Sequence, residues 1–169
     1  MRAGLDIVGL TVRDESGRRK GTVRDVLFDN SGRRVIGVII RRGCFHRQHE
    51  FVAFEYIRSF GRDSLIAGTG RTCSEFEGRD NALQGKLVVS RRGQCLGSVA
   101  DVYIDEATGD VKAYQIASGA RTGPHRQLFI LADSRPMIGD VMVVADPWAA
   151  GRANVYPRLA DSAFVPGTA

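Results

Sequence analysis

The sequence of 169 residues has few cysteines, a single tryptophan and no long apolar run. Its longest apolar stretches, at 35–40 and 141–145, are far shorter than the roughly 20 residues that a membrane-spanning helix needs. The start of the chain lacks the continuous apolar core of a secretory signal. The 3 cysteines are widely spaced and odd in number, unlike a disulfide framework. We therefore expect a cytoplasmic protein in a reducing compartment.

The sequence also lacks the short motifs of common catalytic and nucleotide-binding sites. The glycine-bearing segments 67–70 and 118–123 lack the lysine of a phosphate-binding loop. There is no GxSxG nucleophile turn, no HExxH motif and no CxxC motif. We therefore expect a protein that is not an enzyme and carries no cofactor.

Glycine, in contrast, is abundant at 20 residues, and it separates many short apolar runs. This pattern is typical of an all-β chain with tight turns. The runs also repeat. At an offset of 76, residues 9–43 align with residues 85–119 and give 11 identical pairs of 35, where chance gives about two. The chain therefore contains an internal duplication.

Each copy is predicted to form several short strands, separated by turns rich in Gly, Asn and Asp. We expect them at 10–14, 22–28, 34–40, 50–54 and 64–67, and again at 87–90, 98–104, 111–116, 128–131 and 141–145. An irregular or 3₁₀ turn is expected before the last strand of each copy. Because short strands leave exposed edges unless they close on themselves, we expect two small β-barrels.

The alternation of side chains in the second strand of each copy is imperfect. Val26 and Phe28 share a face that we expect to point inward, whereas Val23 falls on the opposite face. A bulge, or a second apolar contact of barrel against barrel, would explain this. A unit of about 65 residues buries a small core, which favours packing of the two barrels as a pseudo-symmetric pair.

A motif of the form G-x-V-x-D-V-x-x-D occurs at 21–29 and again at 97–105, each time between a glycine turn and a β run. Together with the segment 52–57, it resembles the PRC-barrel family. This barrel is shared by the cytoplasmic part of the photosynthetic reaction-centre H subunit and the C-terminal domain of a ribosome-maturation factor. The second copy departs from the pattern where Ala132 replaces the aromatic position of Phe54. We therefore expect its last turn to differ.

The resemblance divides the chain into four parts. We expect a first PRC-type barrel at 5–67, a linker at 68–82, a second barrel at 83–146 and a C-terminal tail at 147–169. The aromatic residues of the tail indicate that part of it docks on a surface. The family implies a non-catalytic adaptor that binds a protein partner and meets a membrane only through that partner. A homo-oligomer is also compatible with it.

The net charge of +5 lies in the first part of the chain. Residues 1–76 hold 14 Lys and Arg against 9 Asp and Glu, whereas residues 77–169 hold 10 of each. A solvated basic face is the simplest interpretation. The candidates for contact with a partner or with phosphates are Arg18, Arg19, Lys20, Arg33, Arg34, Arg41 and Arg42. The alternative function is therefore an RNA- or ribosome-associated factor, although the sequence lacks an array of exposed aromatics for base stacking.

Asp25 and Asp101 are symmetry-related carboxylates, which could in principle form an acid–base pair. The sequence lacks the Asp-Thr/Ser-Gly turn that would bring such a pair together. We therefore expect Asp25, Asp29, Asp101 and Asp105 to be structural turn residues.

Cys44, His46 and His49 lie close together in the sequence, and His125 lies in the matching loop of the second copy. These residue types suit zinc. Their spacing matches no strong zinc pattern, and loose groups of His and Cys in loops are usually inert. We therefore expect no metal site.

Overall fold

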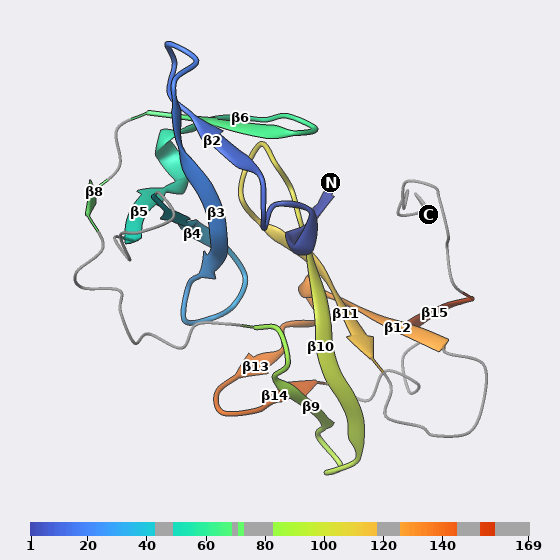
Figure 1. Cartoon of the computed structure of the whole chain (residues 1–169). Coiled ribbons are helices and arrows are strands. Elements are labelled where there is room, and N and C mark those ends of the chain that lie inside the picture. Colours follow the sequence, from blue (N-terminus) through green and yellow to red (C-terminus); the bar gives the residue numbers. More distant parts are fainter. Residues whose placement is uncertain (43–48, 69–70, 73–82, 118–125, 145–152, 158–169) are drawn as a thin grey trace.

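The structure of the protein, a computed structural model, describes residues 1–42, 49–68, 71–72, 83–117, 126–144 and 153–157. Within these ranges the chain forms two β-sheets and three short 3₁₀ turns, without an α-helix (Figure 1). None of the helical turns in this described part is long and apolar enough to cross a membrane.

The first copy forms a seven-stranded sheet in the order β6-β7-β2-β3-β4-β5-β8. Its strands are β2 (Thr11–Arg13), β3 (Arg19–Phe28), β4 (Val35–Arg41), β5 (His49–Ala53), β6 (Ile57–Phe60), β7 (Ser64–Ala67) and β8 (Arg71–Thr72). Neighbours run antiparallel except β2 and β7, which run parallel. The 3₁₀ turn η2 (Phe54–Tyr56) separates β5 from β6.

The second copy repeats this topology strand for strand, in the order β13-β14-β9-β10-β11-β12-β15. Its strands are β9 (Leu87–Ser90), β10 (Cys95–Ile104), β11 (Val111–Ala117), β12 (Arg126–Leu131), β13 (Met137–Ile138), β14 (Met142–Val144) and β15 (Ala153–Pro157). The equivalent pair β9 and β14 is again parallel. The last turn does differ: after η3 (Ala132–Ser134), Arg135 is left-handed with φ 50°, whereas Ile57 after η2 is extended.

Within the described ranges neither sheet closes into a barrel, which corrects the expectation of two closed barrels. The ladder of the first sheet ends at β6 and β8, and that of the second ends at β13 and β15. Closure would need β5 and β12 to pair with the strands that follow η2 and η3. Their outer edges are instead occupied by β8, from the expected linker, and by β15, from the expected tail. These additions cover the edges without closing the sheets.

A bulge in each long strand explains the imperfect alternation. In β3 the pairing register shifts between Val23 and Asp25, so Arg24 is the extra residue. The shift resets the alternation of side chains, and Val23 and Val26 are both buried. β10 has the same shift at the equivalent position.

The two sheets share one apolar core. A single cluster of buried side chains draws on both copies, and it contains the identical and equivalent residues Ile40 and Ile116. The side chains of Ile40 and Ile116 are 1% and 0% exposed. The copies therefore pack against each other through their interiors.

A symmetric pair of backbone hydrogen bonds joins the copies. Val35 N–H donates to the Gly109 carbonyl, and Val111 N–H donates to the Arg33 carbonyl, both at 2.8 Å. Val35 aligns with Val111 and Arg33 aligns with Gly109 in the duplication. A pseudo-two-fold axis therefore passes between these hairpins, as in an isologous dimer interface.

The first strand of the chain crosses to the second sheet. β1 (Arg2–Ala3) pairs with β10, with Arg2 opposite Ile104, and η1 (Gly4–Asp6) follows against the same strand (Figure 1). Arg2 Nε donates to Glu106 Oε1 at 3.0 Å, and its Nη1 donates to the Gly61 carbonyl at 2.8 Å. Arg2 therefore ties the two copies together.

Candidate interaction surface

The seven basic candidates of the first copy form two separate groups. One group lies where β3 begins and β4 ends, and comprises Arg18, Arg19, Lys20, Arg41 and Arg42. The other, Arg33 and Arg34, lies in the hairpin turn at the opposite end of these strands. β3 has 10 residues, so its two ends lie about 30 Å apart at 3.3 Å per residue.

Arg33 and Arg34 lie at the pseudo-two-fold axis. Asp29 Oδ1 accepts hydrogen bonds from their backbone N–H groups at 2.8 and 3.2 Å, which fixes the turn. Arg34 Nε lies 3.9 Å from Oδ1 of Asp110, the residue that aligns with Arg34 in the second copy. In a symmetric dimer of one copy, the same residue would face itself across the axis and the two charges would be alike. In this duplicated chain the two equivalent positions carry opposite charges.

A groove of about 770 Å³ opens beside this axis, between the hairpin turns of the two copies. Its lining carries charges of both signs. Lys112 Nζ lies 3.7 Å from Asp105 Oδ2 and 4.0 Å from Asp110 Oδ2. Because Arg34 also faces Asp110, much of this charge is neutralised within the groove. The groove therefore offers no field of one sign that would select a charged ligand.

The group at the other end of β3 differs in its charge balance. Arg42 Nε lies 2.6 Å from Oε2 of Glu50, a carboxylate buried on β5. Arg18, Arg19 and Arg41 are exposed and have no carboxylate partner among the described residues. The guanidinium groups of these three arginines therefore form no ion pair within the described residues, and the one carboxylate of the adjacent turn, Asp14, accepts a hydrogen bond from the Arg18 backbone N–H at 2.9 Å.

Arg24 belongs with these residues, although no pattern in the sequence marks it. As the bulge residue of β3 it is exposed, and its Nη1 lies 2.6 Å from Nε2 of His49. His49 in turn is opposite Arg41 in the β4–β5 ladder. A single arginine between Val23 and Asp25 does not mark a site. The bulge that turns Arg24 outward was one of two explanations that the alternation pattern left open.

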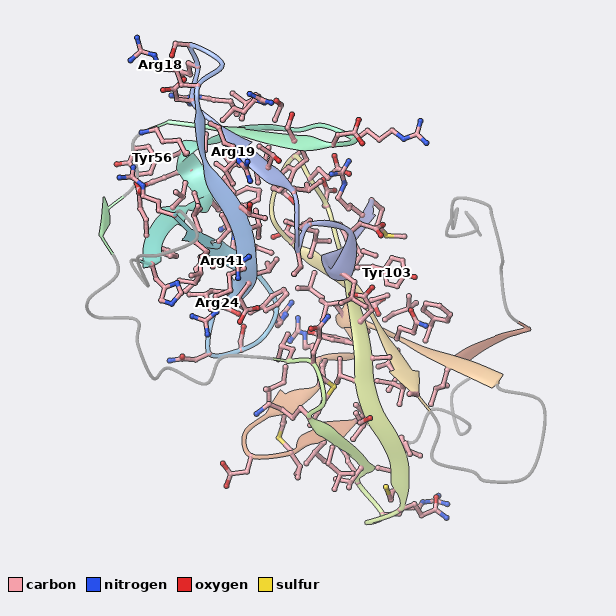
Figure 2. All side chains as sticks on the ribbon, in the orientation of Figure 1. Arg18, Arg19, Arg24, Arg41, Tyr56 and Tyr103 are labelled. Atoms are coloured by element: carbon pink, nitrogen blue, oxygen red, sulfur yellow. The ribbon has the colours of Figure 1, made fainter. Side chains whose placement is uncertain are left out.

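We call Arg18, Arg19, Arg24 and Arg41 the arginine stripe. Figure 2 shows Arg18 at the tip of the β2–β3 hairpin, with Arg19, Arg41 and Arg24 successively further along the sheet. The second copy has neutral residues at the four equivalent positions, which are Gln94, Cys95, Ala100 and Ala117. The stripe is therefore a property of the first copy alone.

Asp29 and Asp105 both hold hairpin turns. The Ser31 hydroxyl donates to Asp29 Oδ2 at 2.7 Å, and Asp105 Oδ1 accepts a hydrogen bond from Ala107 N–H at 2.9 Å. The bond from Ala107 is the main reason that the pKa of Asp105 lies below its ordinary value. Both carboxylates are thus engaged by their own turns.

Asp25 and Asp101 lie in strands beside the bulges, not in turns. Asp25 Oδ1 accepts a hydrogen bond from Val26 N–H at 2.8 Å. Asp101 Oδ1 accepts from Val102 N–H at 2.7 Å and from Leu5 N–H at 3.1 Å, which ties η1 to β10. Burial raises the pKa of Asp101 despite these bonds. Both carboxylates line one small pocket between the copies.

The residues considered as zinc ligands fall mostly outside the described part of the chain. Cys44, His46 and His125 lie outside it, and His49 contacts Arg24. No group of three or more His, Cys, Asp or Glu within the described ranges could hold a metal ion. The expectation of no metal site therefore stays a prediction.

The duplicated sequence, the matched sheets and the axis between them define the class of this protein as a tandem all-β repeat with two equivalent units. The family model described as PRC-barrel domain matches residues 2–69 and again residues 77–150. The chain therefore belongs to the PRC-barrel family and contains two copies of the domain in tandem. No curated protein matches the sequence.

Proposed function

We propose that the protein is a non-catalytic adaptor, which binds a protein partner through the outer surface of its sheets. PRC-barrel domains are generally interaction modules, which supports this class of function. The observation that carries the proposal is the arginine stripe, where four exposed cations lack carboxylate partners within the described structure. Unpaired charges on a surface contribute more to the binding of an external partner than charges that are already paired within the protein.

The symmetry-related carboxylates have a structural explanation that fits a non-catalytic protein. Asp101 joins η1 to β10 through two backbone hydrogen bonds, and Asp25 holds Val26 N–H in the equivalent strand. In the proposed mechanism, arginines steer the approach of the partner and apolar side chains supply affinity. A cytoplasmic location stays a prediction.

The adaptor proposal is tested by affinity capture from native lysate with the full chain as bait, after nuclease treatment. We expect a defined protein that is retained in a fixed ratio to the bait and is absent from a tag-only control. If no protein is retained above that control, the proposal is wrong.

The alternative, an RNA- or ribosome-associated factor, is supported by the same uncompensated arginines. Binding to phosphates predicts an affinity that falls steeply with added salt. The measurement is retention of labelled single-stranded RNA at low salt and at physiological salt. Absence of retention at low salt would eliminate this alternative.

A further inference from the structure

We propose that the arginine stripe is the docking site for an extended, acidic segment of a partner protein, which lies along β3 on the outer face of the first sheet. This inference rests on the proposed adaptor function and names the chemistry of its partner. Three observations carry it: the pairing of arginines in this chain, the geometry of the stripe, and its apolar neighbours.

The first observation is a contrast between arginines within the described structure. Arg2 lies 3.0 Å from Glu106, and Arg58 lies 3.0 Å from Glu15. The four arginines of the stripe have no such carboxylate. A planar guanidinium forms its strongest side-chain contacts with carboxylates, often through two parallel hydrogen bonds. A partner that brings carboxylates would therefore supply the contacts that the stripe lacks.

The second observation is the length and direction of the stripe. Arg19 and Arg24 both lie on β3, five residues apart, and the strand rise places them about 17 Å apart. Arg41 lies between them on the neighbouring strand, opposite Thr22. Alternate side chains of an extended peptide are about 6.6 Å apart on one face. About three alternate carboxylates therefore match the stripe, which favours an extended segment over a compact anion.

The third observation is a partly exposed aromatic side chain beside the stripe. On the outer face of the sheet, the row next to Arg41 places Ile39 opposite Phe51. Phe51 is half-buried and packs with the small cluster that contains Leu27 and Ile39. Aromatic residues and arginines together are typical of protein–protein interfaces.

A nucleic acid fits this surface less well. Proteins that hold single strands stack successive bases on several exposed aromatic side chains. Among the aromatic side chains of residues 1–42, 49–68, 83–117 and 128–144, Tyr56 is the one that is exposed. The second copy is neutral at the equivalent positions, so the basic surface does not extend onto it through these positions. The chemistry therefore favours carboxylates on a protein segment.

The test uses a labelled peptide of about 12 residues with glutamate at every second position, and leucine and threonine between the glutamates. Its affinity for the full chain is compared with that of a single-stranded RNA of the same length. The stripe variant is R24Q/R41Q. The matched control is R62Q/R91Q, which removes the same charge from two exposed arginines outside the stripe.

We expect the wild-type chain to bind the peptide more tightly than the RNA. R24Q/R41Q weakens peptide binding by about tenfold or more, because charge-assisted hydrogen bonds are lost. R62Q/R91Q changes it by less than about twofold, because charge removed at a distance is screened. Thermal unfolding establishes that the variants are folded, and R18Q/R19Q replaces R24Q/R41Q if the bulge tolerates no change.

Three outcomes would overturn the inference: equal weakening in the stripe variant and its control, tighter stripe-dependent binding of the RNA, or no peptide binding. A separate measurement, lysate capture, tests the adaptor proposal. If lysate capture retains the same protein on the wild type and on R24Q/R41Q, the adaptor function stands and the stripe is not its site. If the wild type captures no protein, the adaptor proposal itself fails.

Discussion

The first and second copies have the same strand order and the same bulges but different outer surfaces. Buried positions are conserved between the copies as apolar residues, with Val12 matching Val88 and Ile40 matching Ile116. The exposed arginine stripe of the first copy is neutral in the second. The comparison shows that the topology constrains the interior, whereas the outer face is free to take a different role in each copy.

The interiors also differ at particular points. Glu50 is buried opposite Ile40 in the first sheet, at the place where the second sheet has Leu128 opposite Ile116. The ion pair with Arg42 compensates that carboxylate. The second copy therefore has an apolar core at a position where the first retains a charge.

The largest effect is expected from truncating the shared core at its matched residues. Ile40→Ala and Ile116→Ala each remove a fully buried side chain from one cluster. Each should cost about 2 to 5 kcal/mol of unfolding free energy. Because the core is continuous, denaturant unfolding should show one transition in both variants. Two transitions in either variant would mean that the copies unfold independently.

A smaller effect is expected at the matched turn glycines. Gly9 has φ 92° and Gly85 has φ 77°, and no atom lies within 4 Å of where a Cβ would stand. Gly9→Ala and Gly85→Ala should therefore each cost about 1 to 2 kcal/mol, entirely from backbone strain. Equilibrium unfolding of both variants measures this cost. Costs that differ by more than the error between the two sites would contradict the equivalence of the turns.

A contact without a counterpart should have a still smaller effect. The buried Tyr114 hydroxyl donates to the Gly32 carbonyl at 3.0 Å across the copies, whereas the equivalent residue in the first copy is Val38. Tyr114→Phe should cost about 0.5 to 1.5 kcal/mol, the net worth of one hydrogen bond. Urea unfolding of the variant measures it, and an unchanged midpoint would show that the bond contributes nothing.

The smallest effect concerns Asp101 and depends on pH. Burial raises the pKa of Asp101 in the folded state. Its contribution to stability is therefore full below the ordinary carboxyl pKa and declines as the pH rises through the folded pKa. Asp101→Asn keeps the Oδ1 acceptor without the charge. The stability of D101N relative to wild type should therefore increase from acid to neutral pH, and a constant difference would contradict this.

Much of the fold follows from the sequence because it depends on local and repeated patterns. The duplication and the turns at Asp29 and Asp105 are visible as spacing of apolar, Gly and Asp residues, whereas the bulges were one of two explanations for the imperfect alternation. Closure of the sheets could not be decided in this way. It depends on which distant segment reaches the edges of β5 and β12, and the short segments β8 and β15 carry no strong strand pattern.

The candidate site was less accessible to sequence reasoning. Seven basic residues are close together in the sequence, yet Arg33 and Arg34 lie at the opposite end of β3 from the others. Arg24 joins the stripe because a bulge turns it outward. Arg42 leaves it because Glu50, on the next strand, neutralises its charge. Each of these outcomes depends on strand register, which sequence spacing does not determine.

The most direct test of the account is amide hydrogen exchange at Val35 and Val111, whose N–H groups join the two copies. If the copies form one cooperative unit, both amides exchange with the same free energy as the amides of Ile40 and Ile116, in global unfolding. Exchange at Val35 and Val111 that is faster by about 100-fold or more, while the amides of Ile40 and Ile116 stay protected, would show that the copies separate without unfolding.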